Sequence, residues 1–282
     1  DLVRNLLREQ HADLAELGLS ELANGWDNVI YRLGDELTIR LPRRQMAAVL
    51  VEHEQRVLPA LAERLPIAIP APVRVGTPAL GYPWSWSVNP WLPGSIAAAT
   101  PFHDSAAEAR RLGEFLASLH IAAPADAPPN PYRGHFIGDN TARFHERVEG
   151  LRAVPGFDAD AALVRWADLV DVDPYTGTPV WLHGDLHPAY VLVDGGEISA
   201  VIDFGDVCAG DPATDLACAW SLFQDPRHRA LLRTEAGAIE DATWQRAEAW
   251  ALHFAVTYLA HSADSPTMGT IGRRLLETLS IP

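Results

Sequence analysis

The sequence Leu-His-Gly-Asp-Leu-His-Pro-Ala-Tyr occupies residues 182–190, and Ala-Val-Ile-Asp-Phe-Gly-Asp follows at residues 200–206. Between them, two short apolar segments flank an Asp-Gly-Gly turn, which predicts a β-hairpin. Asp185 lies in the irregular loop before this hairpin, and Asp203 comes directly after it. The pattern therefore predicts two neighbouring carboxylates. Such a pair suits phosphoryl transfer, in which one carboxylate accepts a hydroxyl proton and the other holds magnesium.

The chain before this stretch predicts a β-rich lobe with one prominent helix. Turn residues at 25–28, Gly-Asp at 34–35 and Pro42 separate segments with alternating or helical apolar patterns. We expect helices at 2–18 and 45–64, and strands at 29–33, 36–41, near 71–76 and near 84–92. Pro90 and the Pro-Gly pair at 93–94 mark the end of this lobe.

The remainder of the chain predicts a mostly helical lobe interrupted by the hairpin. Expected helices span 105–121, 139–152, 158–170, 213–224, 241–262 and 266–279, and a Pro/Ala-rich connector covers 122–135. The fold class is therefore α+β, with a small sheet lobe over residues 1–90 and a larger helical lobe over 91–282. A hinge near 88–94 would join them, and a cleft between two lobes is the usual place for a ligand.

Composition limits the broad class of protein. The chain has 282 residues and 48% hydrophobic content, enough for one large domain or two lobes with their own cores. No stretch approaches the roughly 20 apolar residues that span a bilayer. The first residues lack a signal peptide pattern, and two cysteines do not make a disulfide framework. These features predict a cytoplasmic protein, and nothing in them requires more than a monomer.

The net charge of −15 is unevenly distributed. Residues 1–94 carry nine basic and eleven acidic side chains, whereas residues 95–282 carry thirteen basic and twenty-six acidic ones. The acidic second part argues against partners such as nucleic acid and anionic membranes, and it favours a cationic ligand. A solvated acidic surface explains the same excess equally well. All 22 basic residues are arginine, so no catalytic role can fall to a lysine.

The two aspartate segments resemble a known family. His-Gly-Asp-Leu-His-Pro at 183–188 is similar to the catalytic loop of aminoglycoside phosphotransferases, and Asp-Phe-Gly at 203–205 resembles their metal-binding segment. The order of elements matches over residues 20 to 280. The resemblance implies a protein-kinase-like two-lobe fold that uses ATP or GTP with Mg²⁺. It makes Asp185 the catalytic base and Asp203 the metal ligand, with Asp206 and Asp215 expected to brace the loop.

Tyr190 departs from the family pattern, which has a metal-binding asparagine five residues after the catalytic aspartate. A phenol with a pKa of about 10 is a poor metal ligand at neutral pH. Three interpretations remain open: Tyr190 points away and water fills the coordination site, the phenol coordinates weakly, or the protein is catalytically impaired. Macrolide kinases of the same superfamily also resemble this chain in lacking the asparagine.

The nucleotide-binding residues are expected in the first lobe. Arg40 is the candidate cation for the phosphates, and Glu54 in the following helix is its candidate partner, with Glu52 as a rival. Asn28 and the backbone of the turn at 25–28 are candidates to approach phosphate. By the resemblance, the hinge residues Val88, Asn89 and Trp91 offer backbone groups to adenine.

Together these features predict a kinase that phosphorylates a hydroxyl group of a small substrate. The acidic helical lobe favours a cationic antibiotic such as an aminoglycoside, and acidic residues bind protonated amines. A macrolide or another small alcohol is the alternative acceptor. A catalytically impaired nucleotide-binding relative is the alternative to an enzyme, because of Tyr190.

Overall fold

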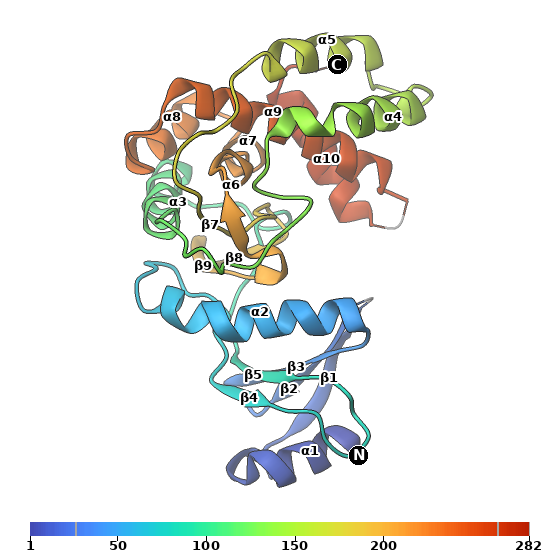
Figure 1. The fold of residues 1–282 in the computed structure, drawn as a ribbon, viewed down its shortest axis with the longest axis vertical. Coiled ribbons are helices and arrows are strands. Elements are labelled where there is room, and N and C mark those ends of the chain that lie inside the picture. Colours follow the sequence, from blue (N-terminus) through green and yellow to red (C-terminus); the bar gives the residue numbers. More distant parts are fainter. Residues whose placement is uncertain (26, 264, 282) are drawn as a thin grey trace. The chain divides into compact units, whose positions relative to one another are not determined.

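The computed structural model describes residues 1–25, 27–263 and 265–281. They form two compact units (Figure 1). The first contains Asp1–Pro93 together with Val201–Gly205, and the second contains Gly94–Ala200 and the chain from Asp206 onward. The sequence placed the boundary after residue 90 and assigned all later residues to the helical lobe. In the structure Asp203 belongs to the first unit.

The first unit is an antiparallel sheet with helices on its two faces. Its strands occur in the order β1-β2-β3-β5-β4. In Figure 1, α1 and α2 lie on opposite faces of this sheet. The element bounds are α1 Leu2–Gln10, the 3₁₀ turn η1 Ala12–Leu14, β1 Leu19–Asn24, β2 Asn28–Leu33, β3 Leu37–Pro42, α2 Gln45–Ala62, β4 Arg74–Gly76 and β5 Trp86–Pro90.

A hydrophobic core joins α1 to the sheet. Leu6 and Leu7 of α1 pack with Ile39 of β3 and Trp86 of β5, all fully buried. A side chain at Gly76 of β4 would place its Cβ 1.8 Å from the Trp86 ring. Glycine is therefore required where the edge strand crosses this indole, because any larger residue would displace it.

Two expectations for the N-terminal segment were wrong. The predicted helix over 2–18 ends at Gln10, because His11 adopts φ −143° and ψ 62° and stops the helical hydrogen bonds. A strand, β1, then covers Leu19–Asn24, where none was expected. This strand is exposed over nearly its whole length, so its sequence lacks the apolar alternation that reveals a half-buried strand.

The second unit contains two small sheets. One has three strands in the order β6-β8-β9, and the other pairs β10 with β7. The predicted hairpin corresponds to β8 and β9. The strand bounds are β6 Ser95–Ile96, β7 Val180–Leu182, β8 Val191–Asp194, β9 Glu197–Val201 and β10 Cys208–Gly210. Strand β7 ends and β8 begins on either side of residues 183–190, so the sheets anchor both ends of that loop.

Helices make up most of the second unit, and α9 is its central element (Figure 1). Fourteen of its twenty residues are buried, including Trp250 and Phe254. The bounds are α3 Ser105–Leu119, η2 Ile137–Asn140, α4 Thr141–Leu151, α5 Ala159–Val170, η3 Phe204–Asp206, α6 Ala213–Leu216, α7 Cys218–Leu222, α8 Pro226–Glu235, α9 Asp241–Ala260 and α10 Pro266–Thr278.

The region after residue 212 departs from expectation in two ways. The helix predicted over 213–224 is split into α6 and α7, and α8 follows where no helix was predicted. The side chain of Asp225 accepts a hydrogen bond from the backbone N–H of Arg227 (2.8 Å), and Pro226 occupies the first turn. An aspartate at the N-cap and a proline in the first turn are standard signals for a helix start, so the sequence contained the information needed to predict α8.

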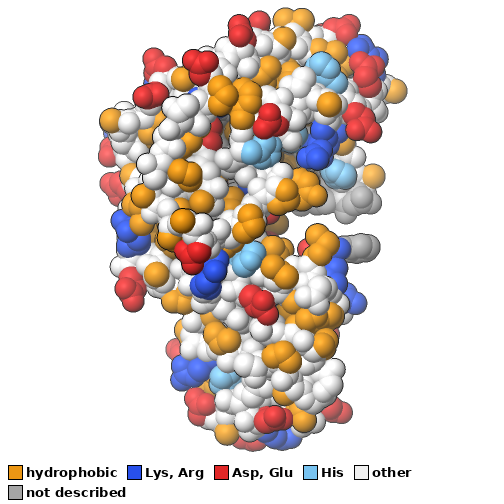
Figure 2. Space-filling view, in the orientation of Figure 1, with side chains coloured by type: hydrophobic (Ala, Val, Ile, Leu, Met, Phe, Trp, Pro, Cys, Tyr) orange, Lys and Arg blue, Asp and Glu red, His pale blue; other side chains and the backbone are white. Residues whose placement is uncertain are grey.

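Acidic side chains are dispersed over the visible face of both units (Figure 2). No helix among the described residues is long and apolar enough to cross a membrane.

Candidate functional site

The loop of residues 183–190 is held in place by a glycine and a buried aspartate. Gly184 has φ +89°, and a Cβ there would lie 2.5 Å from the backbone oxygen of Asp206. The fully buried Asp215 accepts hydrogen bonds from the backbone N–H groups of His183 and Gly184, each at 2.8 Å. His120 Nε2 lies 3.2 Å from the same carboxylate. These contacts agree with the bracing role expected for Asp215.

Asp185 is surrounded by hydrogen-bond donors. Arg133 Nη2 donates to its Oδ1 at 3.0 Å, and the Tyr258 hydroxyl approaches the same oxygen at 3.4 Å. His187 Nε2 lies 3.5 Å from Oδ2. Burial alone would raise the pKa of Asp185, but the hydrogen bond from His187 and the charge of Arg133 hold that pKa well below its usual range. Asp185 is therefore held in its ionised form.

The neighbours of Asp185 are themselves oriented. His187 Nδ1 accepts the backbone N–H of Ala189 at 3.2 Å, so the ring proton of the neutral imidazole sits on Nε2, facing Asp185. Burial, then the charge of Asp185, raises the pKa of Tyr258 far above its usual range, which keeps its hydroxyl a donor.

Arg133 joins two carboxylates. Besides Asp185, it lies 3.8 Å from Asp206 Oδ2, and Asn130 donates to Asp206 Oδ1 at 2.7 Å. Burial disfavours the charge of Arg133, but Asp185 and Asp206 outweigh it and raise its pKa. Sequence reasoning missed Asn130 and Arg133, because they lie in the Pro-rich connector, where neither periodicity nor motif singles out a residue.

Tyr190 contacts the same loop. Its ring stacks on His187 with centroids 4.1 Å apart and planes inclined by 27°. Its backbone N–H donates to the carbonyl of His187 at 2.8 Å. The ring stack and the backbone hydrogen bond both connect Tyr190 to His187, the residue that faces Asp185.

The first unit pairs Arg40 with Glu54. Arg40 on β3 donates through Nη1 to both carboxylate oxygens of Glu54 on α2, each at 2.6 Å. Burial raises the pKa of Glu54, opposed by Arg40 and reinforced by the charge of Asp203. The rival Glu52 is exposed and accepts instead from the Ser85 hydroxyl at 3.1 Å. The ion pair therefore involves the predicted partner, Glu54.

Asp203 lies near this pair within the first unit. It has φ +63°, a backbone conformation that non-glycine residues rarely adopt and that is enriched at functional sites. A Cβ on Gly205 would lie 3.4 Å from Asp203 Oδ1 and 3.9 Å from Arg40 Nη2. No donor among residues 1–25, 27–263 and 265–281 binds the Asp203 carboxylate.

The carboxylate of Asp203 is a suitable ligand for magnesium. Mg²⁺ is typically bound by one or two carboxylates together with water and substrate phosphates. An unengaged carboxylate beside Arg40 provides such a ligand. The described part of the chain contains no cluster of three or more His, Cys, Asp or Glu side chains that would enclose a metal without a substrate.

The predicted hinge residues are partly committed to the sheet. Val88 is fully buried in β5, and its carbonyl accepts the N–H of Val73 at 2.8 Å. Trp91 donates its backbone N–H to Glu36 at 2.6 Å and stacks under the guanidinium of Arg32, 3.8 Å from the ring centroid. Asn89 differs, because its buried Oδ1 has no partner among the described residues.

Asn28 begins β2 at the base of the predicted phosphate loop. Its carbonyl accepts the N–H of Gly25 at 3.0 Å, and Arg43 binds Gly25 O at 2.9 Å. Arg44 forms an ion pair with Asp27. The buried Oδ1 of Asn28 has no partner in the described chain. Trp26, part of the predicted turn, lies outside the described residues.

Comparison with known protein families identifies the family of this chain. The model of the phosphotransferase enzyme family matches residues 18–250, most of the chain. The chain belongs to this family. Arg40, Glu54 and Asp203 of the first unit fall within the matched region, as does the Asp185 loop of the second unit.

Solved structures similar to this phosphotransferase share its fold. The GDP and kanamycin complex of APH(2″)-IIIa is 21% identical, with 99% of this chain and 98% of that chain covered and a TM-score of 0.70. Macrolide 2′-phosphotransferase type I is 23% identical over 97% and 95% of the two chains, with a TM-score of 0.65. The apoenzyme of macrolide 2′-phosphotransferase MphH from Brachybacterium faecium is 21% identical over 98% and 97%, with a TM-score of 0.62.

One curated relative matches only locally. The uncharacterized protein YcbJ of Bacillus subtilis is 34% identical over 70 residues, which span 24% of this phosphotransferase and 23% of YcbJ. The likenesses thus establish a two-lobe phosphotransferase fold, the α+β protein-kinase-like class predicted from the sequence.

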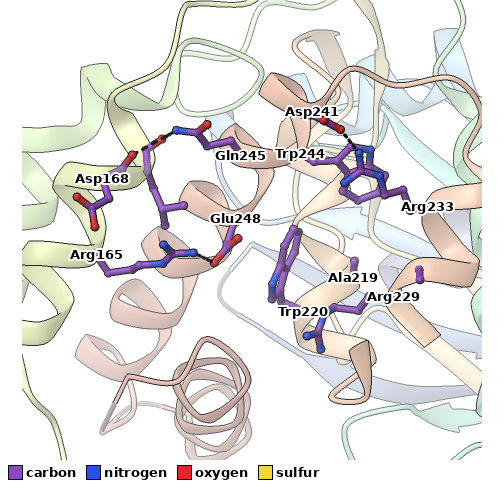
Figure 3. A pocket seen from close by; sticks show the side chains of 12 residues that line it. Arg165, Asp168, Ala219, Trp220, Arg229, Arg233, Asp241, Trp244, Gln245 and Glu248 are labelled. Carbon is purple, nitrogen blue, oxygen red and sulfur yellow. Dashed lines mark hydrogen bonds and ion pairs between the residues drawn. The ribbon is translucent and has the colours of Figure 1, made fainter. Parts of the chain in front are cut away.

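The phosphotransferase also has a pocket of about 520 Å³ between α5, α7, α8 and α9 (Figure 3). None of the predicted site residues lines it. Its charges are matched within the wall: Arg165 pairs with Glu248, and Arg233 pairs with Asp241, as the dashed lines show. Because these ion pairs balance the charges that line the pocket, the pocket has no clear preference for a charged ligand.

Proposed function

We propose that this protein transfers the terminal phosphoryl group of ATP or GTP to a hydroxyl group of a small molecule, with Asp185 as the base. The observation that carries the proposal is the environment of Asp185, an ionised carboxylate held by Arg133, Tyr258 and His187. Family membership and the nucleotide complexes among the structural neighbours support the reaction class.

In the proposed reaction the acceptor oxygen bonds to the terminal phosphorus as the bond from that phosphorus to the bridging oxygen breaks. The hydroxyl proton passes to Asp185, and the nucleoside diphosphate leaves. A carboxylate with a lowered pKa is a weak base, which suits a loose transition state in which positioning contributes more than proton abstraction. The braces from Asp215 to the loop backbone supply that positioning.

The first unit supplies the nucleotide-binding groups of the proposal. Arg40, fixed by Glu54, presents positive charge to phosphate oxygens, and its planar fork replaces the lysine that kinases usually place there. Asp203 would hold Mg²⁺, which neutralises phosphate charge when bound. Asn89 offers a buried amide oxygen without a partner in the described chain, beside the hinge, and Asn28 lies at the base of the phosphate loop, where its amide NH₂ would donate to phosphate.

Tyr190 serves the loop in this proposal. Its stack on His187 supports the interpretation in which water, and not the phenol, completes the metal coordination. The catalytically impaired alternative predicts nucleotide binding without turnover.

The nature of the acceptor is a separate question. The acidic surplus of the second part of the chain predicted a cationic antibiotic such as an aminoglycoside. The immediate neighbours of Asp185 include Arg133, which already occupies the position next to the base that an acceptor amine would favour. We therefore do not extend the proposal to aminoglycosides.

The test is a coupled assay for nucleoside diphosphate release with magnesium, ATP or GTP, and a panel of hydroxylated compounds. Asp185→Asn should lose nearly all acceptor-dependent release and keep nucleotide affinity. Asp168→Asn, an exposed aspartate of α5, is the matched control and should behave as wild type. Wild-type turnover in Asp185→Asn would show that Asp185 is not the base.

A further inference from the structure

Three arginines lie near one another in the second unit, and one of them, Arg133, contacts Asp185. Arg133 lies in the connector, with its guanidinium 5.1 Å from the ring centroid of Phe254 on α9. Arg147 on α4 donates to Thr257 Oγ1 at 2.9 Å and lies 3.4 Å from His253 Nε2, both on α9. Arg143 lies one turn earlier on α4, 5.5 Å from the ring of Tyr132. We call Arg133, Arg143 and Arg147 the arginine cluster.

The positive charge of this cluster is only partly neutralised. Arg133 pairs with Asp185 and Asp206, but among the described residues neither Arg143 nor Arg147 forms an ion pair. Burial, then repulsion from Arg143 and Arg133, lowers the pKa of Arg147, opposed only by the charge of Glu146. A surplus of positive charge is therefore concentrated here, in the part of the chain whose overall charge is strongly negative.

The polar atoms left unpaired in this neighbourhood are donors. Arg133 Nε, His135 Nδ1 and His253 Nδ1 are buried without a hydrogen-bond partner in the described chain. Arg147 donates to His253 Nε2, and Asn140 Nδ2 contacts His135 Nε2 at 2.9 Å. Both Nε2 atoms are thus acceptors, which puts the ring protons on Nδ1. Buried donors without acceptors are costly, and a ligand rich in acceptor oxygens suits them.

We propose that the acceptor molecule carries an oxyanion, a carboxylate or phosphate, that Arg143 and Arg147 bind while its hydroxyl group faces Asp185. This inference rests on the proposed function for the role of Asp185. Arginine binds both oxyanions through two parallel N–H groups, which fixes orientation as well as affinity. A polycationic acceptor would meet like charge from the arginine cluster and would have to compete with Arg133 for Asp185.

The arginine cluster therefore selects acceptors by charge. The acidic residues elsewhere on the second unit act at longer range through solvent, where salt screens them beyond about 10 Å. Arg147, half-buried and hydrogen-bonded to Thr257, is screened less by salt.

The experiment measures binding, so it does not depend on turnover. Inorganic phosphate and kanamycin are titrated calorimetrically into the intact protein, with ADP and magnesium saturating the nucleotide site. Phosphate should bind the wild type, and Arg143→Ala and Arg147→Ala should each weaken it by about tenfold, the loss expected for one charge-assisted contact. Arg147→Lys should recover part of the affinity because it restores the charge without the fork.

Arg152→Ala is the matched control, since Arg152 follows α4 directly but is neutralised by Glu149 and Asp160. It should bind phosphate as the wild type does. Phosphate that fails to bind the wild type, or that binds the Arg143 and Arg147 variants equally well, would overturn the proposal, as would tighter binding of kanamycin. Asp185→Asn separates the two proposals: it should abolish turnover and keep phosphate binding, and retained turnover would refute the base without affecting the arginine result.

Discussion

The ring of Tyr190 stacks on the imidazole of His187, with the two centroids 4.1 Å apart. His187 in turn directs Nε2 toward Asp185 Oδ2 at 3.5 Å. A residue that departs from the family pattern therefore contacts the base through one intermediate side chain. The aromatic ring of Tyr190 makes this contact.

This relationship predicts that Tyr190→Phe preserves activity and magnesium dependence, because the ring remains. Tyr190→Asn should lose the stack and destabilise the fold by about 0.5–1.5 kcal/mol, the usual worth of an aromatic pair. Magnesium titrations of turnover and urea unfolding of both variants measure the two effects. A large loss of activity or magnesium affinity in Tyr190→Phe would instead make the phenol oxygen a metal ligand.

The buried pair of Arg40 and Glu54 predicts a strong effect of removing one partner. Arg40→Ala leaves the carboxylate of Glu54, only 3% exposed, without its cation. We expect a loss of about 3–5 kcal/mol in the free energy of unfolding, measured with urea, and loss of nucleotide binding.

The double variant Arg40→Met with Glu54→Leu separates stability from function. Replacing a buried pair by apolar residues is often neutral or stabilising, so this variant should regain most of the stability. It should not regain nucleotide binding, because the charge for the phosphates is gone. Recovery of nucleotide affinity would show that Arg40 only supports the fold.

The contacts of Asp215 predict that the loop of residues 183–190 needs both carboxylate oxygens of this residue to keep its conformation. In Asp215→Asn one oxygen becomes an NH₂ group, which cannot accept the N–H of either His183 or Gly184. We expect a destabilisation of about 1–3 kcal/mol from the unsatisfied donor. The turnover number should fall more than the nucleotide affinity, because the substitution lies in the second unit. An unchanged turnover number would show that the loop does not depend on this brace.

The sequence predicted the elements that carry strong periodicity or a motif. The hairpin after Asp185, α2, α9 and the pairing of Arg40 with Glu54 are all present. The loop of residues 183–190 was found from its motif, and the role of Asp185 as the base stays a prediction. The exposed strand β1 was missed because tertiary pairing with β2, and not its own pattern, makes it a strand.

The arginine cluster was missed for a different reason. Arg133 comes from the connector, and Arg143 and Arg147 come from α4. Arg133 contacts Asp185, 52 residues later in the chain, and Arg147 packs on α9. Net charge pointed the other way, since it averages over the whole second part of the chain. Only distances between side chains reveal that the local sign differs from the average.

His253 predicts how stability changes with pH. It is 4% exposed, and burial, then repulsion from Arg147, Arg133 and Arg143, lowers its pKa to about 3. The unfolded chain has a histidine pKa of about 6.5, so between these values the unfolded state binds one more proton. Stability is therefore complete above about pH 6.5 and is lost as pH falls, by about 1.4 kcal/mol for each pH unit. The lowered pKa of Asp185 acts in the same direction, but only below about pH 4.

Urea unfolding between pH 7.5 and 5 isolates the histidine contribution. His253→Gln cannot titrate and should remove most of this slope, while its amide oxygen can still accept from Arg147. His53 on α2 also has a pKa lowered by burial and by Arg56, but it is only partly buried. His53→Gln should therefore flatten the slope much less. Equal slopes in the wild type and His253→Gln would mean that His253 is protonated in the folded protein. That result would contradict the lowered pKa, which burial and the neighbouring arginines cause.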